Sequence, residues 1–219
     1  MERGRTGKTM MSINRRDAIR LGICAAGAYA VGGTTVSAQD NPMPKELREA
    51  LEREPNAPVL GKGNGDITLT EFFDYNCPFC RASVDDVHRL ISEDKNLRVV
   101  FREWPVFGEG SVFSTKASLA ALKQKKYWQF HTALMAIKGE ANETTAIKVA
   151  QQVDLDLHRL REDMESPEVL GHIEHSMALA NHMGLMGTPT FIAGNEALFG
   201  KQSHSDLRGL VQRGRAALL

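Results

Sequence analysis

The chain has 219 residues, of which 42% are hydrophobic and 25% are charged. This composition excludes a disordered or fibrous protein, and the length suits one sizeable core that carries an insertion. Without residues 1–38, which hold six basic and two acidic residues, the chain keeps 21 basic and 25 acidic residues. The resulting net charge of −4 gives no sign of a nucleic-acid partner.

The first 38 residues have the features of an export signal. Arg15 and Arg16 precede a mildly apolar stretch from 21 to 36, and 36–38 (Val-Ser-Ala) offers the small residues that a signal peptidase reads. The paired arginines resemble a twin-arginine signal. A membrane anchor is the alternative, but 16 residues interrupted by four glycines fall short of the roughly 20 that a span needs. We therefore predict export with cleavage near Ala38 and no stable membrane insertion.

The number of cysteines in the exported chain limits the disulfides that it can form. Cys24 lies inside the predicted signal peptide, so the exported chain keeps Cys77 and Cys80 as its one pair. A single pair cannot form a framework of structural bridges. These two cysteines are therefore either one disulfide or a working dithiol.

Residues 39–58 are predicted to be a flexible leader with a short helix at 45–53, and Val59-Leu60 to begin a short edge strand. Residues 67–73 read as a strand of β-branched and aromatic residues. Its alternation puts Glu71 on the same face as three apolar side chains, those of Ile67, Leu69 and Phe73.

A helix is predicted at 77–94, and a second strand at 97–104 that Pro105 ends. From 111 to 184 the pattern is helical, with turn signals near 138–139, 154 and 166–167. Ser166 is expected to cap the last of these helices, with Pro167 at its first position and Gly184 after its end. Its buried face is expected to consist of Val169, Leu170, Ile173, Met177 and Ala180.

The C-terminal part is predicted to be an antiparallel hairpin at 190–199, turning at Gly194-Asn195, and a final helix at 205–217. The order strand, helix, strand, helical block, hairpin, helix predicts an α/β fold. In it, a mixed sheet at 59–219 is flanked by helices and interrupted by a helical insertion at about 111–184.

The two cysteines sit where a strand turns into a helix. At a helix start, unpaired backbone amides and the helix dipole stabilise a thiolate, so Cys77 is predicted to be the nucleophile. Pro78 suits the first helical turn because its missing N–H needs no partner. Cys80 is expected to be more buried and less ionised, and to act as the resolving thiol.

The cysteine pair has three alternative interpretations. A zinc site would need a second pair of ligands at finger spacing, which the chain lacks. A Cu(I) site could use the same cysteines with Met183 or Met186 nearby. An inert structural disulfide would close too small a loop to add much stability.

The histidines and tryptophans have structural interpretations. His172, His175 and His182 fall near one side of a predicted helix, where a solvated face explains them as well as a metal site does. We expect Trp104, Trp128 and Phe130 to pack in the core or in the insertion rather than to form a ligand site. We expect no metal and no cofactor.

Two motifs together resemble a known family. The segment at 72–80 (Phe-Phe-Asp-Tyr-Asn-Cys-Pro-Phe-Cys), followed much later by 187–191 (Gly-Thr-Pro-Thr-Phe), is similar to the DsbA-like bacterial periplasmic thiol:disulfide oxidoreductases. The resemblance implies a thioredoxin fold with a helical insertion, protein substrates that contain cysteines, and a membrane redox partner that resets the dithiol. It also implies a periplasmic location.

By this resemblance, Pro189 is a cis-proline beside the dithiol and Thr188 offers its backbone to an extended substrate; an ordinary trans proline entering a strand is the alternative. Glu71 takes the place of the family's buried acid, and as an unpaired carboxylate in an apolar row it should have a raised pKa and accept the Cys80 proton. A partly solvated glutamate is the alternative. Catalytic roles thus fall to Cys77, Cys80 and Glu71.

Phe79 departs from the strongest oxidases of the family, which carry a histidine there. A phenyl ring neither carries charge nor donates a hydrogen bond, so the pKa of Cys77 is expected to be less depressed and the couple less oxidising than in those enzymes. Pro78 and Phe79 are expected to contact substrate together with Thr188 and Pro189. The direction of exchange, oxidase or isomerase, stays open.

Overall fold

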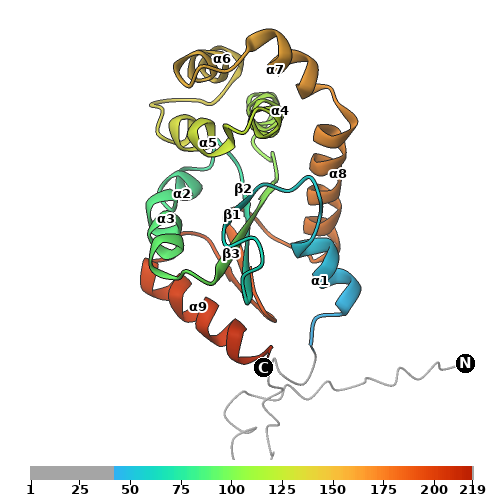
Figure 1. The fold of residues 1–219 in the computed structure, drawn as a ribbon, viewed down its shortest axis with the longest axis vertical. Helices are drawn as coiled ribbons and strands as arrows, with labels where there is room; N and C mark the ends of the chain where they lie inside the picture. Colours follow the sequence, from blue (N-terminus) through green and yellow to red (C-terminus); the bar gives the residue numbers. More distant parts are fainter. Residues whose placement is uncertain (1–41, 219) are drawn as a thin grey trace, which may run out of the picture. The chain divides into compact units, whose positions relative to one another are not determined.

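The computed structural model describes residues 42–218. The predicted signal peptide and Cys24 lie outside the described residues. Within them, one mixed five-stranded sheet has the order β1-β3-β2-β4-β5 and is flanked by helices (Figure 1). The predicted α/β class is confirmed.

The strands run close to their predicted bounds. They are β1 (Val59–Gly61), β2 (Ile67–Phe73), β3 (Leu97–Glu103), β4 (Thr190–Ala193) and β5 (Glu196–Phe199). β2 and β3 pair in parallel, with Glu71 opposite Phe101 and Phe73 opposite Glu103, and the other three pairings are antiparallel. β2 is therefore central, and its carboxyl end leads directly to the cysteines.

Helices cover both faces of the sheet. On one face α3 (Val84–Glu93) and α9 (His204–Ala216) pack on apolar side chains that include Ile67, Leu69 and Phe73. On the other face α1 (Lys45–Glu52) and α8 (Pro167–His182) pack around Phe72 (Figure 1). Every residue of β2 and β3 is buried as a result. Charged residues on these strands must therefore find partners inside the protein.

Five helices stand between β3 and β4. They are α4 (Glu109–Lys123), α5 (Tyr127–Met135), α6 (Glu143–Gln152), α7 (Leu157–Met164) and α8. Gly139 and Asp154, at two predicted turns, adopt left-handed conformations with φ of 88° and 52°. The inserted helical part predicted from the sequence is present, and α4 to α7 lie beyond the carboxyl end of β2 (Figure 1).

The single helix predicted at 77–94 is wrong in detail. The segment forms α2 (Pro78–Arg81) and α3, separated by a turn at Ala82 and Ser83. The buried Ser83 hydroxyl donates to the Phe79 carbonyl at 2.9 Å. A serine that bonds the carbonyl four residues back tends to bend a helix, which fits the break at this point.

The predicted inner face of α8 also needs correction. Met177 is 42% exposed, whereas His172 and Ser176 are fully buried. Ser166 occupies the N-cap position, but among the described residues its side chain makes no capping hydrogen bond. His172 turns inward because two buried carboxylates face α8. Its ring nitrogens lie 2.7 Å from Glu103 of β3 and 3.2 Å from Glu54, which follows α1.

Two glycines let α9 lie directly on the hairpin that follows Pro189. A Cβ atom on Gly214 would lie 2.8 Å from the carbonyl carbon of Ala193, and Gly194 has a φ of +60°. We expect Gly214→Ala to lower the free energy of unfolding in urea by about 1–3 kcal/mol, because overpacking forces the backbones apart.

Gly209→Ala is the matched control on the same helix. Its Cβ atom would meet the far end of the Arg213 side chain alone, so no loss is expected, and helix propensity offers a gain of up to ~1 kcal/mol. Equal losses in the two variants would contradict the close approach at Gly214.

Candidate functional site

The dithiol lies at the carboxyl end of β2. Cys77 is the N-cap residue of α2 and Cys80 lies within that helix; both are free thiols, 1% and 0% exposed. The Cys77 thiol donates a hydrogen bond to the carbonyl of Thr188 at 3.2 Å. The Thr188–Pro189 peptide bond is cis, and Pro189 is buried. Segments 111 residues apart in the chain therefore meet at the sulfur.

The two thiols are opposite in acidity. The pKa of Cys77 is lowered to about 6, chiefly by the hydrogen bond from the Cys80 thiol, with further hydrogen bonds from the backbone amides of Cys80 and Phe79. These outweigh burial, which raises it. The pKa of Cys80 is raised, first by burial and then by the hydrogen bond that its proton makes to Cys77. Cys77 is thus the thiolate at neutral pH and Cys80 keeps its proton.

The structure changes the reason for this acidity. The predicted causes are unpaired backbone amides and the dipole of a long helix. The amides of Cys80 and Phe79 do stabilise the Cys77 thiolate, whereas α2 has four residues. A dipole this short is weak, and hydrogen bonds from the neighbouring thiol and amides are the larger cause. Phe79 contributes through its backbone, while its side chain is 56% exposed.

Glu71 is buried in the central strand, 5% exposed. Its pKa is raised from 4.5 to about 8, first by burial and then by the negative charges of Cys77 and Glu103. A carboxyl group of this kind is protonated at neutral pH and gives up its proton at modest cost. It therefore has the acidity that exchange of a proton with a thiol requires.

Asp74 ties the active-site turn to the next segment of the chain. Its carboxylate accepts hydrogen bonds from the amides of Asn76, Val106 and Phe107 at 2.6, 2.7 and 3.1 Å, and from the Ser111 hydroxyl at 2.7 Å. This role of Asp74 is not predicted from the sequence. Asp74 stands inside the motif, but Val106, Phe107 and Ser111 follow 32 to 37 residues later, and local spacing carries no signal for them.

Asn76 and Arg81 join the same turn to the inserted helices. The Asn76 side chain both donates to and accepts from the backbone of Ala141, at 2.9 and 2.7 Å. The Arg81 guanidinium donates to the carbonyls of Tyr75 and Gly139, each at 2.7 Å. The dithiol is held between the sheet and the insertion by these contacts.

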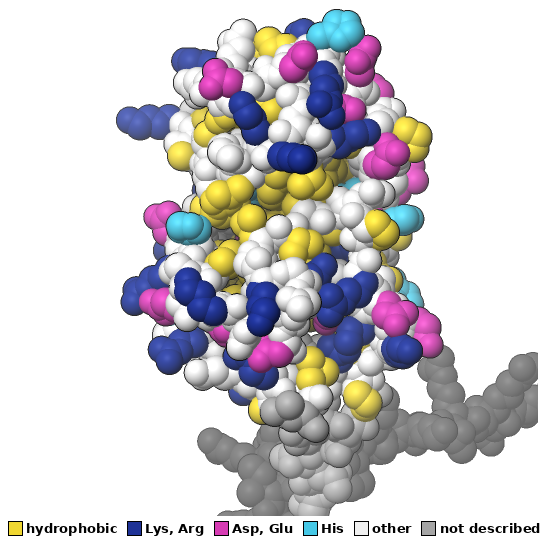
Figure 2. All heavy atoms as spheres, in the orientation of Figure 1, with side chains coloured by type: hydrophobic (Ala, Val, Ile, Leu, Met, Phe, Trp, Pro, Cys, Tyr) yellow, Lys and Arg dark blue, Asp and Glu magenta, His cyan; other side chains and the backbone are white. Residues whose placement is uncertain are grey.

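Exposed apolar side chains come from the segments fixed around the cysteines. Phe79, Val106, Phe107 and Met186 are 56, 45, 53 and 85% exposed. Large apolar side chains open to solvent are unusual when grouped, and such groups mark binding surfaces. Figure 2 shows further apolar side chains across the middle of one face. A groove of about 420 Å³ lies between α3 and α5, and its lining includes Val84, Trp128 and Met135.

The α8 histidines are not one solvated face. The His172 side chain is fully buried and pairs with Glu103, whereas that of His175 is 68% exposed and His182 is also exposed. Among residues 42–218, no group of three or more His, Cys, Asp or Glu side chains is arranged to hold a metal ion. Within the same range, no helix is both long and apolar enough to cross a membrane.

The three aromatic residues pack as predicted. Phe130 is fully buried in the main core, and Trp104 packs edge-on against Phe72 on the other face of the sheet. Trp128 stacks on His131 and His88. Burial lowers the pKa of His131 to about 3, so this imidazole stays neutral in its aromatic surroundings.

Comparison with known proteins identifies the family. Residues 68–212 match the DSBA-like thioredoxin domain. The chain therefore belongs to the DSBA-like thioredoxin family, and its fold is that of thiol:disulfide oxidoreductases.

Solved structures agree. The chain is 49% identical to a thioredoxin-like oxidoreductase from Silicibacter pomeroyi DSS-3, with a TM-score of 0.75 over 77% of this chain and 98% of that one. It is 25% identical to the thiol-disulfide exchange protein alpha-DsbA2 from Wolbachia pipientis, with a TM-score of 0.71 over 77% of this chain and 91% of that one.

A curated relative is much longer. The Na(+)/H(+) antiporter NhaA 3 of Salinispora tropica is 29% identical over 135 residues, which cover 61% of this chain and 21% of that protein. The chain thus matches about a fifth of the length of that relative.

Glu71→Gln tests the buried acid in the oxidised protein, where the cysteines do not titrate. Burial, the largest cause of the raised pKa of Glu71, acts in the disulfide form as well, whereas the charge of Cys77 is absent there. The folded protein therefore keeps a proton that the unfolded chain releases, and stability is lost as the pH rises above 4.5 toward the raised pKa of the folded protein. We expect the wild-type free energy of unfolding to fall relative to the variant above pH 4.5, at about 1.4 kcal/mol per pH unit at most. If the free energy of unfolding of the two proteins changes with pH in the same way, the pKa of Glu71 is not raised.

Proposed function

We propose that the protein exchanges disulfides with substrate proteins in the periplasm, with Cys77 as the nucleophile. The observation that carries the proposal is the placement of the two thiols: Cys77 is the N-cap residue of α2 and contacts the carbonyl of Thr188, while Cys80 is fully buried. The lowered pKa of Cys77 and the raised pKa of Cys80 agree with this placement. Such a pair attacks at neutral pH through one sulfur and resolves through the other.

The difference in acidity between Cys77 and Cys80 supports exchange in either direction. In the oxidising direction a substrate thiolate attacks Cys77 of the disulfide form; a second substrate thiol then resolves the mixed disulfide, and Cys77 leaves as a stable thiolate. In the reducing direction Cys77 attacks a substrate disulfide and Cys80 displaces the substrate. Glu71 accepts the proton of Cys80, whose thiol must ionise before it attacks.

Substrate docking is assigned to the surface around Cys77. Thr188 offers its backbone to an extended chain, and Pro78, Phe79 and Pro189 border the sulfur. The exposed Phe79, whose side chain is 56% accessible, favours apolar segments of incompletely folded substrates. A membrane protein that resets the dithiol is the second partner of the proposal.

A Cu(I)-binding role for the same cysteines is the alternative function. Met186 is 85% exposed in the loop that precedes Thr188, and Met183 packs partly buried behind the sheet. Stoichiometric copper retention without turnover of a reporter disulfide would favour copper binding over exchange.

Cys80→Ser should trap substrates on Cys77, because the resolving sulfur is gone while the nucleophile stays. The expected result is a set of thiol-sensitive adducts when the variant is recovered from the periplasm and run on non-reducing gels. Cys77→Ser is the matched control and should trap none. Equal adducts in the two variants, or none in Cys80→Ser, would count against the mechanism.

Phe79→His should lower the pKa of Cys77 further and make the couple more oxidising. An imidazole adds charge and a hydrogen-bond donor next to the thiolate, and a thiolate stabilised in the reduced form raises the reduction potential. The measurements are thiolate absorbance against pH and equilibration with glutathione, with Phe79→Leu as the control that adds neither. If the pKa of Cys77 and the reduction potential both stay at their wild-type values in Phe79→His, the residue at position 79 does not determine the reduction potential.

A further inference from the structure

The groove between α3 and α5 has a volume of about 420 Å³. Its apolar wall consists of Val84, Trp128 and Met135; Met135 belongs to the main core, and the other two side chains are partly buried against that core. Pockets that bind ligands usually have volumes of roughly 300–1,000 Å³ and mostly apolar walls. The groove therefore has the size and the surface of a binding site.

One of the four polar side chains that line the groove has no partner. The Arg81 guanidinium donates to two backbone carbonyls at 2.7 Å each, the Thr132 hydroxyl donates to the carbonyl of Trp128 at 2.9 Å, and His88 stacks on the Trp128 ring. The exposed Asp85 carboxylate forms neither a hydrogen bond nor an ion pair with any residue between 42 and 218. The groove thus offers one negative charge to a partner.

The aromatic wall of the groove is held in place by stacking. The Trp128 indole stacks on His88, with ring centroids 5.6 Å apart, and on the buried His131, with centroids 5.2 Å apart. A surface that is already ordered loses little conformational freedom when a partner binds. The groove can therefore accept an apolar side chain without rearranging this wall.

The groove begins one helical turn from the nucleophile. The amide of Arg81 donates to the carbonyl of Cys77 at 3.1 Å. Asp85 lies eight residues after Cys77, a separation that corresponds to about 12 Å of helix and to about four residues of an extended chain. Alternate residues of an extended chain point the same way. A substrate held by its cysteine on Cys77 can therefore place the second residue from that cysteine at the apolar wall and the fourth at Asp85.

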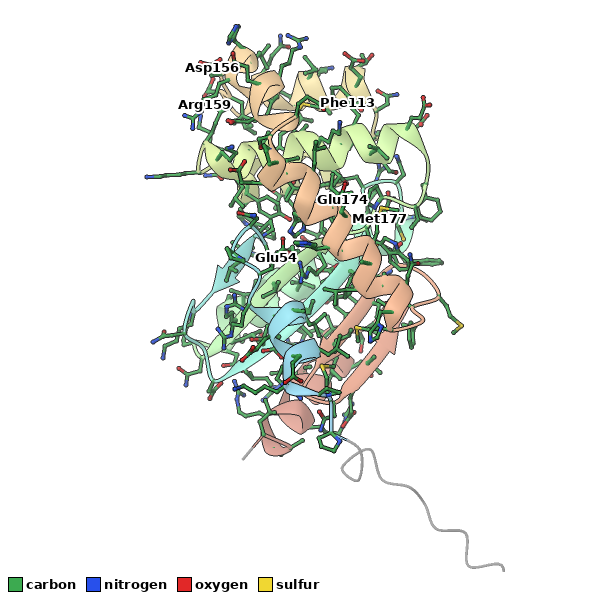
Figure 3. The ribbon with its side chains drawn as sticks, turned by 90° about the vertical axis from the view of Figure 1, so that its right-hand side faces the viewer. Glu54, Phe113, Asp156, Arg159, Glu174 and Met177 are labelled. Atoms are coloured by element: carbon green, nitrogen blue, oxygen red, sulfur yellow. The ribbon has the colours of Figure 1, made fainter. Side chains whose placement is uncertain are left out.

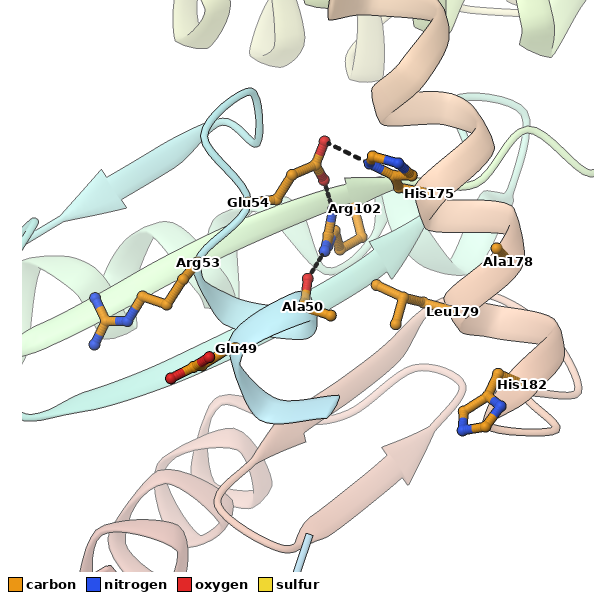
Figure 4. A pocket seen from close by; sticks show the side chains of 9 residues that line it. All are labelled: Glu49, Ala50, Arg53, Glu54, Arg102, His175, Ala178, Leu179 and His182. Atoms are coloured by element: carbon orange, nitrogen blue, oxygen red, sulfur yellow. Dashed lines mark hydrogen bonds and ion pairs between the residues drawn. The ribbon is translucent and has the colours of Figure 1, made fainter. Parts of the chain in front are cut away.

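A second cavity, of about 520 Å³, differs because its acidic residue is neutralised within the chain. It lies against the other face of the sheet, between α1, β3 and α8 (Figure 4). Glu54 at its wall pairs with the buried Arg102, and Oε1 of Glu54 also lies 3.5 Å from Nδ1 of His175. Figure 3 shows Glu54 next to α8 in a view from the side. Glu54 is therefore not open to a cationic partner, whereas Asp85 is.

We propose that the groove between α3 and α5 binds the segment of a substrate protein that adjoins its reactive cysteine. It selects an apolar residue and, two positions farther from the cysteine, a lysine or arginine. This specificity deepens the proposed function and rests on it. Val84, Trp128 and Met135 contact the apolar side chain, and Asp85 pairs with the basic one. These residues determine specificity and take no part in the exchange of sulfurs.

Disulfide-linked dimers of a short peptide with a single cysteine serve as reporters of this specificity. In each peptide the second residue on either side of the cysteine is leucine or serine, and the fourth is lysine or glutamate. Reduced Cys80→Ser protein is mixed with each reporter. The Cys77 thiolate attacks one reporter sulfur, the reporter disulfide breaks, one peptide stays on Cys77 and the other leaves as a thiolate. Mass spectrometry after acid quenching gives the rate at which this adduct forms.

We expect the adduct to form about threefold faster with lysine reporters than with glutamate reporters, which is the size of effect that an exposed ion pair gives. Leucine reporters should react about fivefold faster than serine reporters, because part of the leucine side chain is buried in the groove. The preference for lysine should disappear at ~1 M salt, where the Debye length is about 3 Å.

Asp85→Lys should reverse the charge preference, so that glutamate reporters react about threefold faster than lysine reporters. Asp86→Lys is the matched control, since both aspartates lie in the first turn of α3 but Asp86 does not line the groove. This control should keep the preference for lysine. A reversal in both variants, or in neither, overturns the groove as the site of recognition.

The two tryptophans of the chain give a readout that needs no variant of the groove. Trp128 lines the groove, whereas Trp104 is 8% exposed and packs against Phe72 on the other face of the sheet. In nitrogen-15 spectra the indole signal of Trp128 should shift when a leucine reporter is bound to Cys77, and that of Trp104 should not. A Trp128 signal that stays in place overturns the proposal. A Trp128 signal that shifts with protein concentration in the absence of reporter also overturns it, and assigns the groove to a second copy of the chain.

Failure of the proposed function gives a different result from failure of the groove. If Cys80→Ser forms no adduct with any reporter, disulfide exchange is overturned, and the specificity with it. If adducts form at rates that do not depend on the second and fourth residues, the role of the groove alone is overturned.

Discussion

The Asp74 carboxylate accepts four hydrogen bonds, and the geometry of the dithiol depends on them. Its donors lie in the turn before Cys77 and in the segment from Val106 to Ser111 that enters the inserted helices. A charged acceptor with several donors binds strongly in a buried setting and costs much if one partner is lost. The end of β2 is therefore held against the insertion as one unit, and Cys77 keeps a fixed position opposite Thr188.

That fixed position creates the difference in acidity between the sulfurs. The Cys77 sulfur accepts hydrogen bonds from the Cys80 thiol and from nearby backbone amides, while Cys80 is buried and keeps its proton. Charge on Cys77 is stabilised by groups already in place, whereas charge on Cys80 must appear in an apolar interior. One four-residue helix thus supports a nucleophile at its N-cap and a protonated thiol three residues later.

Burial of β2 and β3 on both faces has a second consequence. Glu71, Arg102 and Glu103 have no access to solvent along the strands, so they gain partners from the surrounding helices or change their protonation. Glu71 changes its protonation, with a pKa of about 8. Glu103 gains His172 as a partner, and Arg102 gains Glu54. The polar inner face of α8 exists to complete these pairs.

Much of the fold and the central site follow from local patterns. The bounds of β2, the hairpin at 190–199 and the place of the cysteines at a strand end depend on period-two alternation and turn residues, which act over a few neighbours. Glu71 could be placed in an apolar row for the same reason. The break between α2 and α3 is not predictable from the sequence, because a serine that bonds back to the Phe79 carbonyl leaves helical periodicity unchanged.

The tertiary structure alone decided which distant groups meet. The carbonyl of Thr188 at Cys77, the amides of Val106 and Phe107 at Asp74, and the contact of His172 with Glu103 each join segments more than 30 residues apart. From the sequence, a solvated face explains His172 as well as a metal site does, because His172, His175 and His182 fall near one side of the helix. Its burial follows from the charges that β3 and Glu54 present to it, and pairing between separate elements is set by packing, which no single segment encodes.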